Sequence, residues 1–337
     1  MKGLIIFNPA AGPRRNWEAL TRAASVLERG GWKVEIVETE NPSEVYALAK
    51  EAASLRYDAV IAAGGDGTVN GVVNGIVETE TALGVLPLGT GNVWARQLGL
   101  TSANLFLSSP NAREAAEFLL ESSTAYVDVG IANGRHFLLW CGIGIDALVT
   151  EEVESHPAVK RKLGATAFVV AGVITAVTFL GTKTYFQLDG KAIRRRMILA
   201  IVSNVRLYGG FIKIAPYARL NDGLLDLCIF KGYRFPQLVH HVYAVFSGKH
   251  VSDPLVEMKQ VSRLTIKTAR PFSIQVDGEP IGKTPVRIEV KPLALKALIP
   301  PTCPTELFGS PPFSPDAPIN RRFKHAGYRS RGQWAFQ

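Results

Sequence analysis

The chain has 337 residues, of which 47% are hydrophobic and 20% charged, a composition that indicates a globular protein and excludes a largely disordered one. Its formal net charge of +9 is spread along the chain and no nucleic-acid motif is present, so we expect no nucleic-acid partner. The three cysteines are widely spaced and match no metal-ligand pattern, which predicts free thiols and excludes a disulfide framework.

A short apolar run at the start of the chain, Leu4 to Phe7, predicts a buried strand. It leads into a candidate phosphate-binding loop, Asn8-Pro9-Ala10-Ala11-Gly12. Because no cationic segment with a cleavage site precedes this strand, we expect no signal peptide and a cytoplasmic protein. A second strand is expected over 33–38 and a helix over 45–53.

The most informative stretch is Gly64-Gly65-Asp66-Gly67-Thr68-Val69-Asn70. It follows an apolar run from Tyr57 to Ala63 and precedes a helix-like recurrence of apolar residues from Val69 to Val77. Glycines permit a tight turn, and the first N–H groups of a helix attract an anion, so this order predicts a nucleotide phosphate site. The alternative, a turn that binds nothing, would not need an acid and a hydroxyl between glycines.

Two other glycine patterns fit known nucleotide motifs poorly. Gly282-Lys283-Thr284 lacks the first glycine of a P-loop and is followed by proline, so it is not a P-loop. The run from Gly142 to Ala147 matches the dinucleotide pattern, but it lies in mid-chain and no acid follows at the required distance. We interpret it as a strand-to-helix turn.

A second glycine loop supports the first. Thr81 to Leu88 predicts a strand, and Gly89-Thr90-Gly91-Asn92 then leads into a helical pattern from Val93 to Leu98. Three strand-to-loop junctions therefore carry glycine with Asn or Thr. In a parallel sheet all three would lie at the carboxyl edge, where ligands bind.

The periodicity divides the chain into two domains. Strands and helices alternate over residues 1–125, which predicts a doubly wound α/β nucleotide-binding domain. Strands dominate over 126–290 and predict a β-sandwich-like domain, with strands expected over 126–131, 134–141, 184–188, 197–203, 224–230, 264–268, 272–276 and 286–290. Prolines and arginines over 301–337 predict a disordered basic tail.

Five motifs, in order along the chain, resemble those of the bacterial soluble diacylglycerol kinase family of lipid kinases. They are Asn8-Pro9-x-x-Gly12, Gly64-Gly65-Asp66-Gly67-Thr68 with Asn70, Pro87-Leu88-Gly89-Thr90-x-Asn92, Asp222-Gly223-x-Leu225-Asp226 and Val276-Asp277-Gly278-Glu279. The glycine–aspartate motif alone is shared with NAD kinases and, in variant form, with phosphofructokinases, whereas the ordered set is more specific. The resemblance runs to about residue 300 and implies that 291–300 return to the first domain.

The resemblance implies an enzyme that uses ATP and Mg²⁺ to phosphorylate a lipid alcohol, with diacylglycerol as the first choice. A kinase of NAD or of a sphingoid or other lipid, and a homologue without activity, remain alternatives. Phosphoryl transfer depends on positioning and on neutralising the phosphates. The residues expected to hold ATP are Asn8, Pro9, Ala10, Ala11, Gly12, Thr39, Gly64, Gly65, Asp66, Gly67, Thr68, Val69, Asn70, Gly71, Thr90, Gly91 and Asn92. For Thr39, capping the helix over 45–53 is an equal alternative.

The same resemblance implies roles for several acids. Glu279 matches the proton acceptor, with Asp277 as a close competitor, and Asp66 is expected to act through Mg²⁺. A plain Asp-Gly hairpin turn is the alternative for this pair. A second Mg²⁺ site is implied at Asp222 with the carbonyls of Arg219 and Leu224, near Asp128. One departure is Val93, where many family members have Asp.

A bilayer-resident substrate and the positive net charge together predict peripheral docking to an anionic membrane. Candidate contacts are Lys160-Arg161-Lys162 and Arg194-Arg195-Arg196, for which a solvated strand edge is the alternative. The uncharged segment from Gly164 to Gly181 nearly reaches membrane-spanning length, but the resemblance favours a helix packed on the second domain. The oligomeric state cannot be read from the sequence, and a homodimer is kept open.

Overall fold

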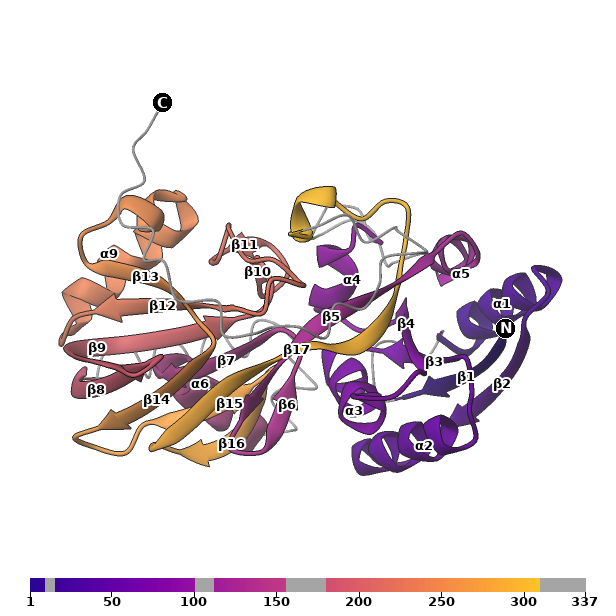
Figure 1. Ribbon diagram of the computed structural model, residues 1–337, viewed down its shortest axis with the longest axis horizontal. Helices are drawn as coiled ribbons and strands as arrows, with labels where there is room; N and C mark the ends of the chain where they lie inside the picture. Colours follow the sequence, from indigo (N-terminus) through magenta and orange to yellow (C-terminus); the bar gives the residue numbers. More distant parts are fainter. Residues whose placement is uncertain (10–15, 101–111, 156–179, 310–337) are drawn as a thin grey trace.

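The computed structural model describes residues 1–9, 16–100, 112–155 and 180–309. Within them the chain forms two domains joined by two long strands, β5 (Ser123–Ala132) and β17 (Val286–Ile299), which pair antiparallel and run side by side between the domains (Figure 1). The predicted fold class, a doubly wound α/β domain followed by a β-sandwich-like domain, is confirmed.

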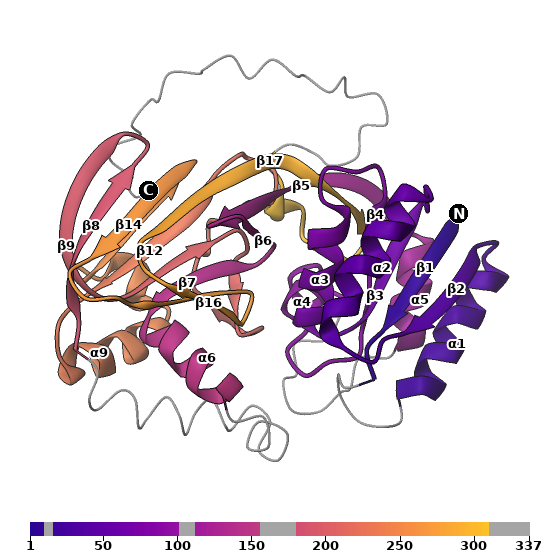
Figure 2. The same ribbon diagram turned by 90° about the horizontal axis from the view of Figure 1, so that it is seen from below.

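The first domain is a parallel sheet in the order β4 (Ala82–Pro87), β3 (Ala59–Gly64), β1 (Lys2–Phe7) and β2 (Lys33–Glu38). Alternate side chains of a strand enter different cores. Leu4 and Ile6 pack with α2 (Pro42–Ser54) and α3 (Asp66–Ile76), whereas Ile5 and Phe7 pack with α1 (Asn16–Arg29) and α5 (Ala112–Leu120). Helices therefore cover both faces of this sheet (Figure 2).

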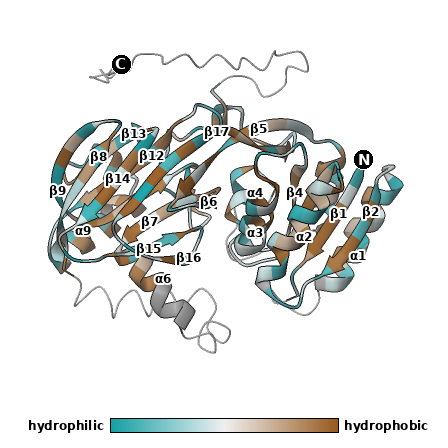
Figure 3. Cartoon of the chain, turned by 60° about the horizontal axis from the view of Figure 1, so that its bottom comes forward, coloured by the Kyte–Doolittle hydropathy of each residue, from teal (hydrophilic) through white to brown (hydrophobic). Residues whose placement is uncertain are grey.

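The second domain is mainly antiparallel and has a core of its own. Hydrophobic and hydrophilic residues alternate along its outer strands, as burial of one face requires (Figure 3). Its strands are β6 (Arg135–Phe137), β7 (Trp140–Gly144), β8 (Thr182–Leu188), β9 (Lys191–Ser203), β12 (Leu225–Lys231), β13 (Val256–Val261), β14 (Arg263–Thr268), β15 (Ser273–Val276) and β16 (Glu279–Lys283). A hairpin of β10 (Leu207–Tyr208) and β11 (Ile212–Lys213), the helices α6 (Ile145–Ser155) and α9 (Phe235–Phe246), and a 3₁₀ turn at Lys249–Ser252 complete it.

Some strands differ from the sequence prediction. The expected strand over 134–141 is split into β6 and β7, because the N–H groups of Leu138 and Leu139 donate to the carboxylate of Asp277. Strand β17 is longer than expected and pairs with β4 in the first domain through Ala297 and Leu83. The dinucleotide-like run is the strand-to-helix turn that we expected, between β7 and α6.

Ordered structure continues past the expected start of the tail. Leu307 and Phe308 are buried, and the N–H of Leu220 donates to the carbonyl of Leu307 at 2.7 Å. Residues 301–309 are therefore part of the folded chain and not of a tail, because apolar side chains anchor this segment to the core. The last 28 positions lie outside the described residues.

No helix in the described part of the chain is long and apolar enough to cross a membrane. The candidate segment from Gly164 lies outside the described residues as far as 179, and so does the basic cluster from Lys160 to Lys162.

Candidate functional site

Three loops meet at the carboxyl edge of the parallel sheet, where β1, β3 and β4 end. The side-chain nitrogen of Asn8, after β1, lies 3.4 Å from the hydroxyl of Thr68, after β3. Of the loop predicted after β1, only Asn8 and Pro9 are described, and Ala10, Ala11 and Gly12 are outside the described residues. The edge combines N–H groups at a helix start with small residues, as a phosphate site requires.

The glycines let two of these loops pack backbone against backbone. A Cβ on Gly89 would lie 2.4 Å from the Cα of Gly65, and one on Gly91 would lie 2.7 Å from Oδ2 of Asp66, so neither position accepts a side chain without a shift. A Cβ on Gly67, by contrast, would meet only Oε1 of Glu279, at 3.7 Å. Gly67 therefore lies beside Glu279 of the second domain, at ordinary contact distance.

The other residues predicted to hold the nucleotide differ in their exposure. Thr90 is exposed, whereas Asn92 is buried in a left-handed conformation (φ 49°) and bonds back to Gly89 through its side-chain amide. Val69 is buried in the core, and a Cβ on Gly71 would lie 2.8 Å from Val45 of α2. Gly71 therefore lies where α3 packs closely against α2.

Thr39 is buried after β2, and its hydroxyl donates to the carbonyl of Phe7 at 3.2 Å. The alternative of a helix cap is wrong, because Asn41 occupies the N-cap of α2. Thr39 instead joins the ends of β1 and β2 beside the loops.

Asp66 joins two of the loops through its carboxylate. Its Oδ1 accepts hydrogen bonds from the N–H groups of Val93 at 2.7 Å and Trp94 at 3.4 Å, which begin α4 (Val93–Gln97). Burial raises the pKa of Asp66 to about 6, and the two N–H donors limit the rise. Val93, the departure from the family pattern, is itself buried in the core.

Asp277 lies at the boundary between the domains, in the turn of the β15–β16 hairpin. Asp277 and Gly278 both have positive φ, 48° and 87°, as a type I′ turn requires, so the predicted hairpin turn is present. The carboxylate is buried and accepts four hydrogen bonds, from the N–H groups of Leu138, Leu139 and Trp140 and from the side chain of Asn70, at 2.8 to 3.0 Å. Burial raises its pKa to about 6.

Glu279 differs from Asp277 in its surroundings although only Gly278 separates them. Its side chain is 41% exposed and forms an ion pair with Arg135. Its Oε1 lies beside Gly67, at the start of α3. Of the two acids, Glu279 is the one accessible from the space between the domains.

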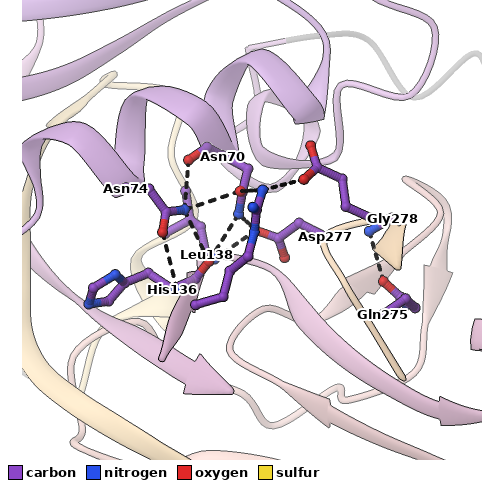
Figure 4. Close-up of polar contacts among 9 residues, drawn as sticks. Asn70, Asn74, His136, Leu138, Gln275, Asp277 and Gly278 are labelled. Carbon is purple, nitrogen blue, oxygen red and sulfur yellow. Dashed lines mark hydrogen bonds and ion pairs between the residues drawn. The ribbon is translucent and has the colours of Figure 1, made fainter. Parts of the chain in front are cut away.

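The structure adds residues that the sequence analysis did not identify (Figure 4). The side-chain amides of Asn70 and Asn74 both donate to the carbonyl of His136 at 3.2 Å, and the N–H of His136 donates back to Asn74. Asn70 and Asn74 are one helical turn apart, a spacing that could have been noticed. Arg135 gave no signal in the sequence, because its partner Glu279 is 144 residues away.

Asp128 and Asp222 form a separate acidic pair near Gly223. Asp128 is fully buried and accepts hydrogen bonds from the N–H groups of Gly223 at 2.6 Å and Leu293 at 2.7 Å. Burial raises its pKa to about 6, and the charge of Asp222 adds to the rise. A cation would relieve this repulsion, and oxygen donors suit Mg²⁺. No group of three or more His, Cys, Asp or Glu side chains able to hold a metal occurs among the described residues.

Comparison with known proteins gives matches over most of the chain. Residues 2–132 match the diacylglycerol kinase catalytic domain, and residues 140–299 match the YegS C-terminal NAD kinase beta sandwich-like domain. A diacylglycerol kinase of Bacillus subtilis (strain 168) is 30% identical over 283 residues, which cover 83% of this chain and 90% of that protein. One from Staphylococcus aureus (strain bovine RF122 / ET3-1) is 29% identical, with coverages of 83% and 87%.

A solved structure is also similar. It is a crystal structure of a protein from Bacillus anthracis strain Sterne assigned as a diacylglycerol kinase, with a TM-score of 0.75 and 26% identity. The match covers 90% of this chain and 96% of that one, so it includes both domains.

Proposed function

We propose a specific reaction for this chain, which belongs to the bacterial soluble diacylglycerol kinase family and is a lipid kinase. In this reaction the γ-phosphoryl group of ATP passes to the hydroxyl of diacylglycerol and yields phosphatidic acid. The hydroxyl oxygen forms a bond to the γ-phosphorus, the bond to the β–γ bridging oxygen breaks, and ADP leaves. Glu279 takes the hydroxyl proton.

One observation carries this proposal: Oε1 of Glu279 lies 3.7 Å from the position that a Cβ on Gly67 would occupy, so this carboxylate of the second domain lies beside the start of α3. The start of α3 is the candidate site for the phosphates, because its first N–H groups have no partner within the helix. A base opposite this helix start can reach a hydroxyl that approaches the end of the phosphate chain. Asp277 is less suited to this role, because four N–H donors already occupy its carboxylate.

The other residues position the phosphates and hold the two domains together. The loops after β1, β3 and β4 bind the phosphates, and Asp277 with Asn70 holds the second domain against α3. Mg²⁺ would neutralise charge on the phosphates, with Asp66 as the candidate carboxylate beside them. The Asp128 and Asp222 pair would hold a second, structural Mg²⁺.

We also propose that the protein is cytoplasmic and binds anionic membranes peripherally, and a homodimer remains open. The net charge supports membrane binding. Arg194 and Arg196 are exposed and, with Lys183 and Lys267, line a shallow pocket of about 530 Å³.

The test is an assay of purified protein with radiolabelled ATP and Mg²⁺ against diacylglycerol, sphingosine and NAD. We expect labelled phosphatidic acid, and we expect EDTA to abolish it. Label that appears only in a sphingoid phosphate or in NADP would refute diacylglycerol as the acceptor. Transfer that persists in EDTA would refute the need for a divalent cation.

A further inference from the structure

Helix α9 carries an apolar stripe that faces away from the core. His241 and Ala244 are the buried residues of this helix. The stripe lies on another side, within an arc of about 100° at 3.6 residues per turn. Its members are 42 to 67% exposed and are Phe235, Val239, Val242, Tyr243 and Phe246. A surface helix of a globular protein usually turns its apolar stripe inward, so this orientation needs an explanation.

One more aromatic residue extends the stripe beyond the helix. Phe211, between β10 and β11, is 51% exposed, and its ring centroid lies 6.3 Å from that of Phe246. We call Phe211 and the five residues of α9 the apolar face.

The chain segment that carries α9 has an excess of positive charge. No Asp or Glu occurs from residue 227 to 252, whereas Lys231, Arg234 and Lys249 lie in this stretch. The guanidinium of Arg196 stands 4.6 Å from the ring centroid of Tyr233, just before α9. The first carboxylate after the helix, Asp253, is paired with His240. An aromatic and aliphatic stripe with a cationic rim is typical of helices that lie in a membrane interface.

The apolar face also connects to the candidate active site. The β10–β11 turn contains Gly210, and a Cβ there would lie 2.9 Å from Cδ of Arg96 and 3.3 Å from the carbonyl of Gly91. Gly91 belongs to the glycine loop after β4, and Phe211 is the next residue after Gly210. One short turn therefore contacts both the phosphate-binding edge and the apolar face.

We propose that the apolar face inserts into the surface of an anionic bilayer, with the surrounding cations against the lipid head groups. Docking in this way holds the bilayer beside the site at which the lipid alcohol is phosphorylated, so the inference rests on the proposed function. A bilayer fits better than a second protein copy as the occupant, because the rim carries cations without the carboxylates that would pair with them across a two-fold interface.

The test is co-sedimentation with vesicles of phosphatidylcholine that contain phosphatidylglycerol as the minority lipid. The double variant Val242→Glu/Phe246→Glu places two carboxylates on the apolar face, and we expect it to weaken vesicle binding by at least about tenfold. The matched control is Tyr46→Glu/Leu55→Glu, which puts the same two carboxylates on exposed apolar residues of the first domain, and it should bind like the wild type. The neutral double variant Val242→Ser/Phe246→Ser should also weaken vesicle binding, by a smaller factor. It keeps the test valid if the glutamates disturb the helix.

Vesicle binding equal to that of the wild type in both double variants of α9 would overturn the proposal. It would also be overturned if the variants changed a dimer into a monomer in sedimentation while vesicle binding stayed intact, because the occupant would then be a second copy. Vesicle binding requires no ATP and no turnover. A protein that loses binding in these variants but phosphorylates no lipid would thus keep the docking surface and refute only the lipid kinase reaction.

Discussion

Replacing Glu279 and Asp277 separately distinguishes the base from the residue that positions it. Glu279→Gln removes the proton acceptor and keeps the shape of the side chain. We expect turnover to fall by about 10² to 10⁴, the usual contribution of a general base. ATP affinity should remain, because the proposed phosphate site lies in loops of the other domain.

For stability we expect the opposite order: Asp277→Asn should lower the free energy of unfolding more than Glu279→Gln does. Glu279 is exposed and forms a surface ion pair with Arg135, so its replacement should change the free energy of unfolding by less than about 1 kcal/mol. In Asp277→Asn the amide nitrogen must replace one carboxylate oxygen, and each oxygen now accepts two hydrogen bonds. Two donors then lose their acceptor, at about 1 to 3 kcal/mol each. Relief of the buried charge offsets part of this, so we expect a net loss of about 2 kcal/mol.

The assay measures turnover, ATP affinity by calorimetry and the thermal midpoint for each variant. Glu289→Gln is the matched control, because Glu289 is 36% exposed, is paired with Arg263 and Arg287, and lies in β17 away from Gly67. It should leave all three quantities near those of the wild type.

Two results would refute this reasoning. If Glu279→Gln keeps near wild-type turnover on the best lipid acceptor, Glu279 is not the base. If Asp277→Asn loses turnover by the same factor while its thermal midpoint and ATP affinity stay unchanged, Asp277 is the base and its four hydrogen bonds do not disqualify it.

Gly67→Val should weaken ATP binding by about tenfold or more, because the side chain enters the proposed phosphate site, and it should leave the thermal midpoint near that of the wild type, because its Cβ meets only Oε1 of Glu279 at ordinary contact distance. Gly89→Ala should instead destabilise the fold by about 1 to 3 kcal/mol, because its Cβ meets backbone; equal effects of the two variants on stability would contradict this. A chain ended at residue 302 should lose about 3 to 6 kcal/mol with Leu307 and Phe308, whereas one ended at 309 should keep its thermal midpoint; an unchanged midpoint in the shorter chain would show that the two side chains do not stabilise the core. Raised folded-state pKa values mean that the folded protein binds more protons than the unfolded chain between pH 3.8 and about 6, so the free energy of unfolding should fall as the pH rises through this window, and urea titrations that show a rise would contradict the assignment to Asp66, Asp128 and Asp277.

The sequence was sufficient for the features that depend on short-range rules. Gly64 and Gly89 follow apolar runs and precede helical patterns, and those local signals placed both loops at strand ends. The parallel order of the strands then follows from the alternation of strands and helices. The dipeptide Asp277-Gly278 likewise predicts a turn, because Asp-Gly is a short-range turn signal.

Contacts between distant segments could not be derived in this way. Asn70 and Asp277 are 207 residues apart, and only the folded chain shows that the buried carboxylate joins the two domains and divides the expected strand over 134–141. The proximity of Glu279 to Gly67 depends on the same contact between the two domains.

Two further features, the apolar stripe of α9 and the segment from residue 301 onward, depend on burial. Periodicity shows that α9 has an apolar stripe, but it cannot tell whether the stripe faces the core or solvent, because that depends on which side the neighbouring strands cover. Prolines and arginines predicted a disordered tail from residue 301 onward, but Leu307 and Phe308 are buried in the core. The sequence by itself determined the local elements and the glycine loops. Tertiary structure decided which surfaces are covered and which acids meet, because burial and long-range contacts are properties of the packed chain.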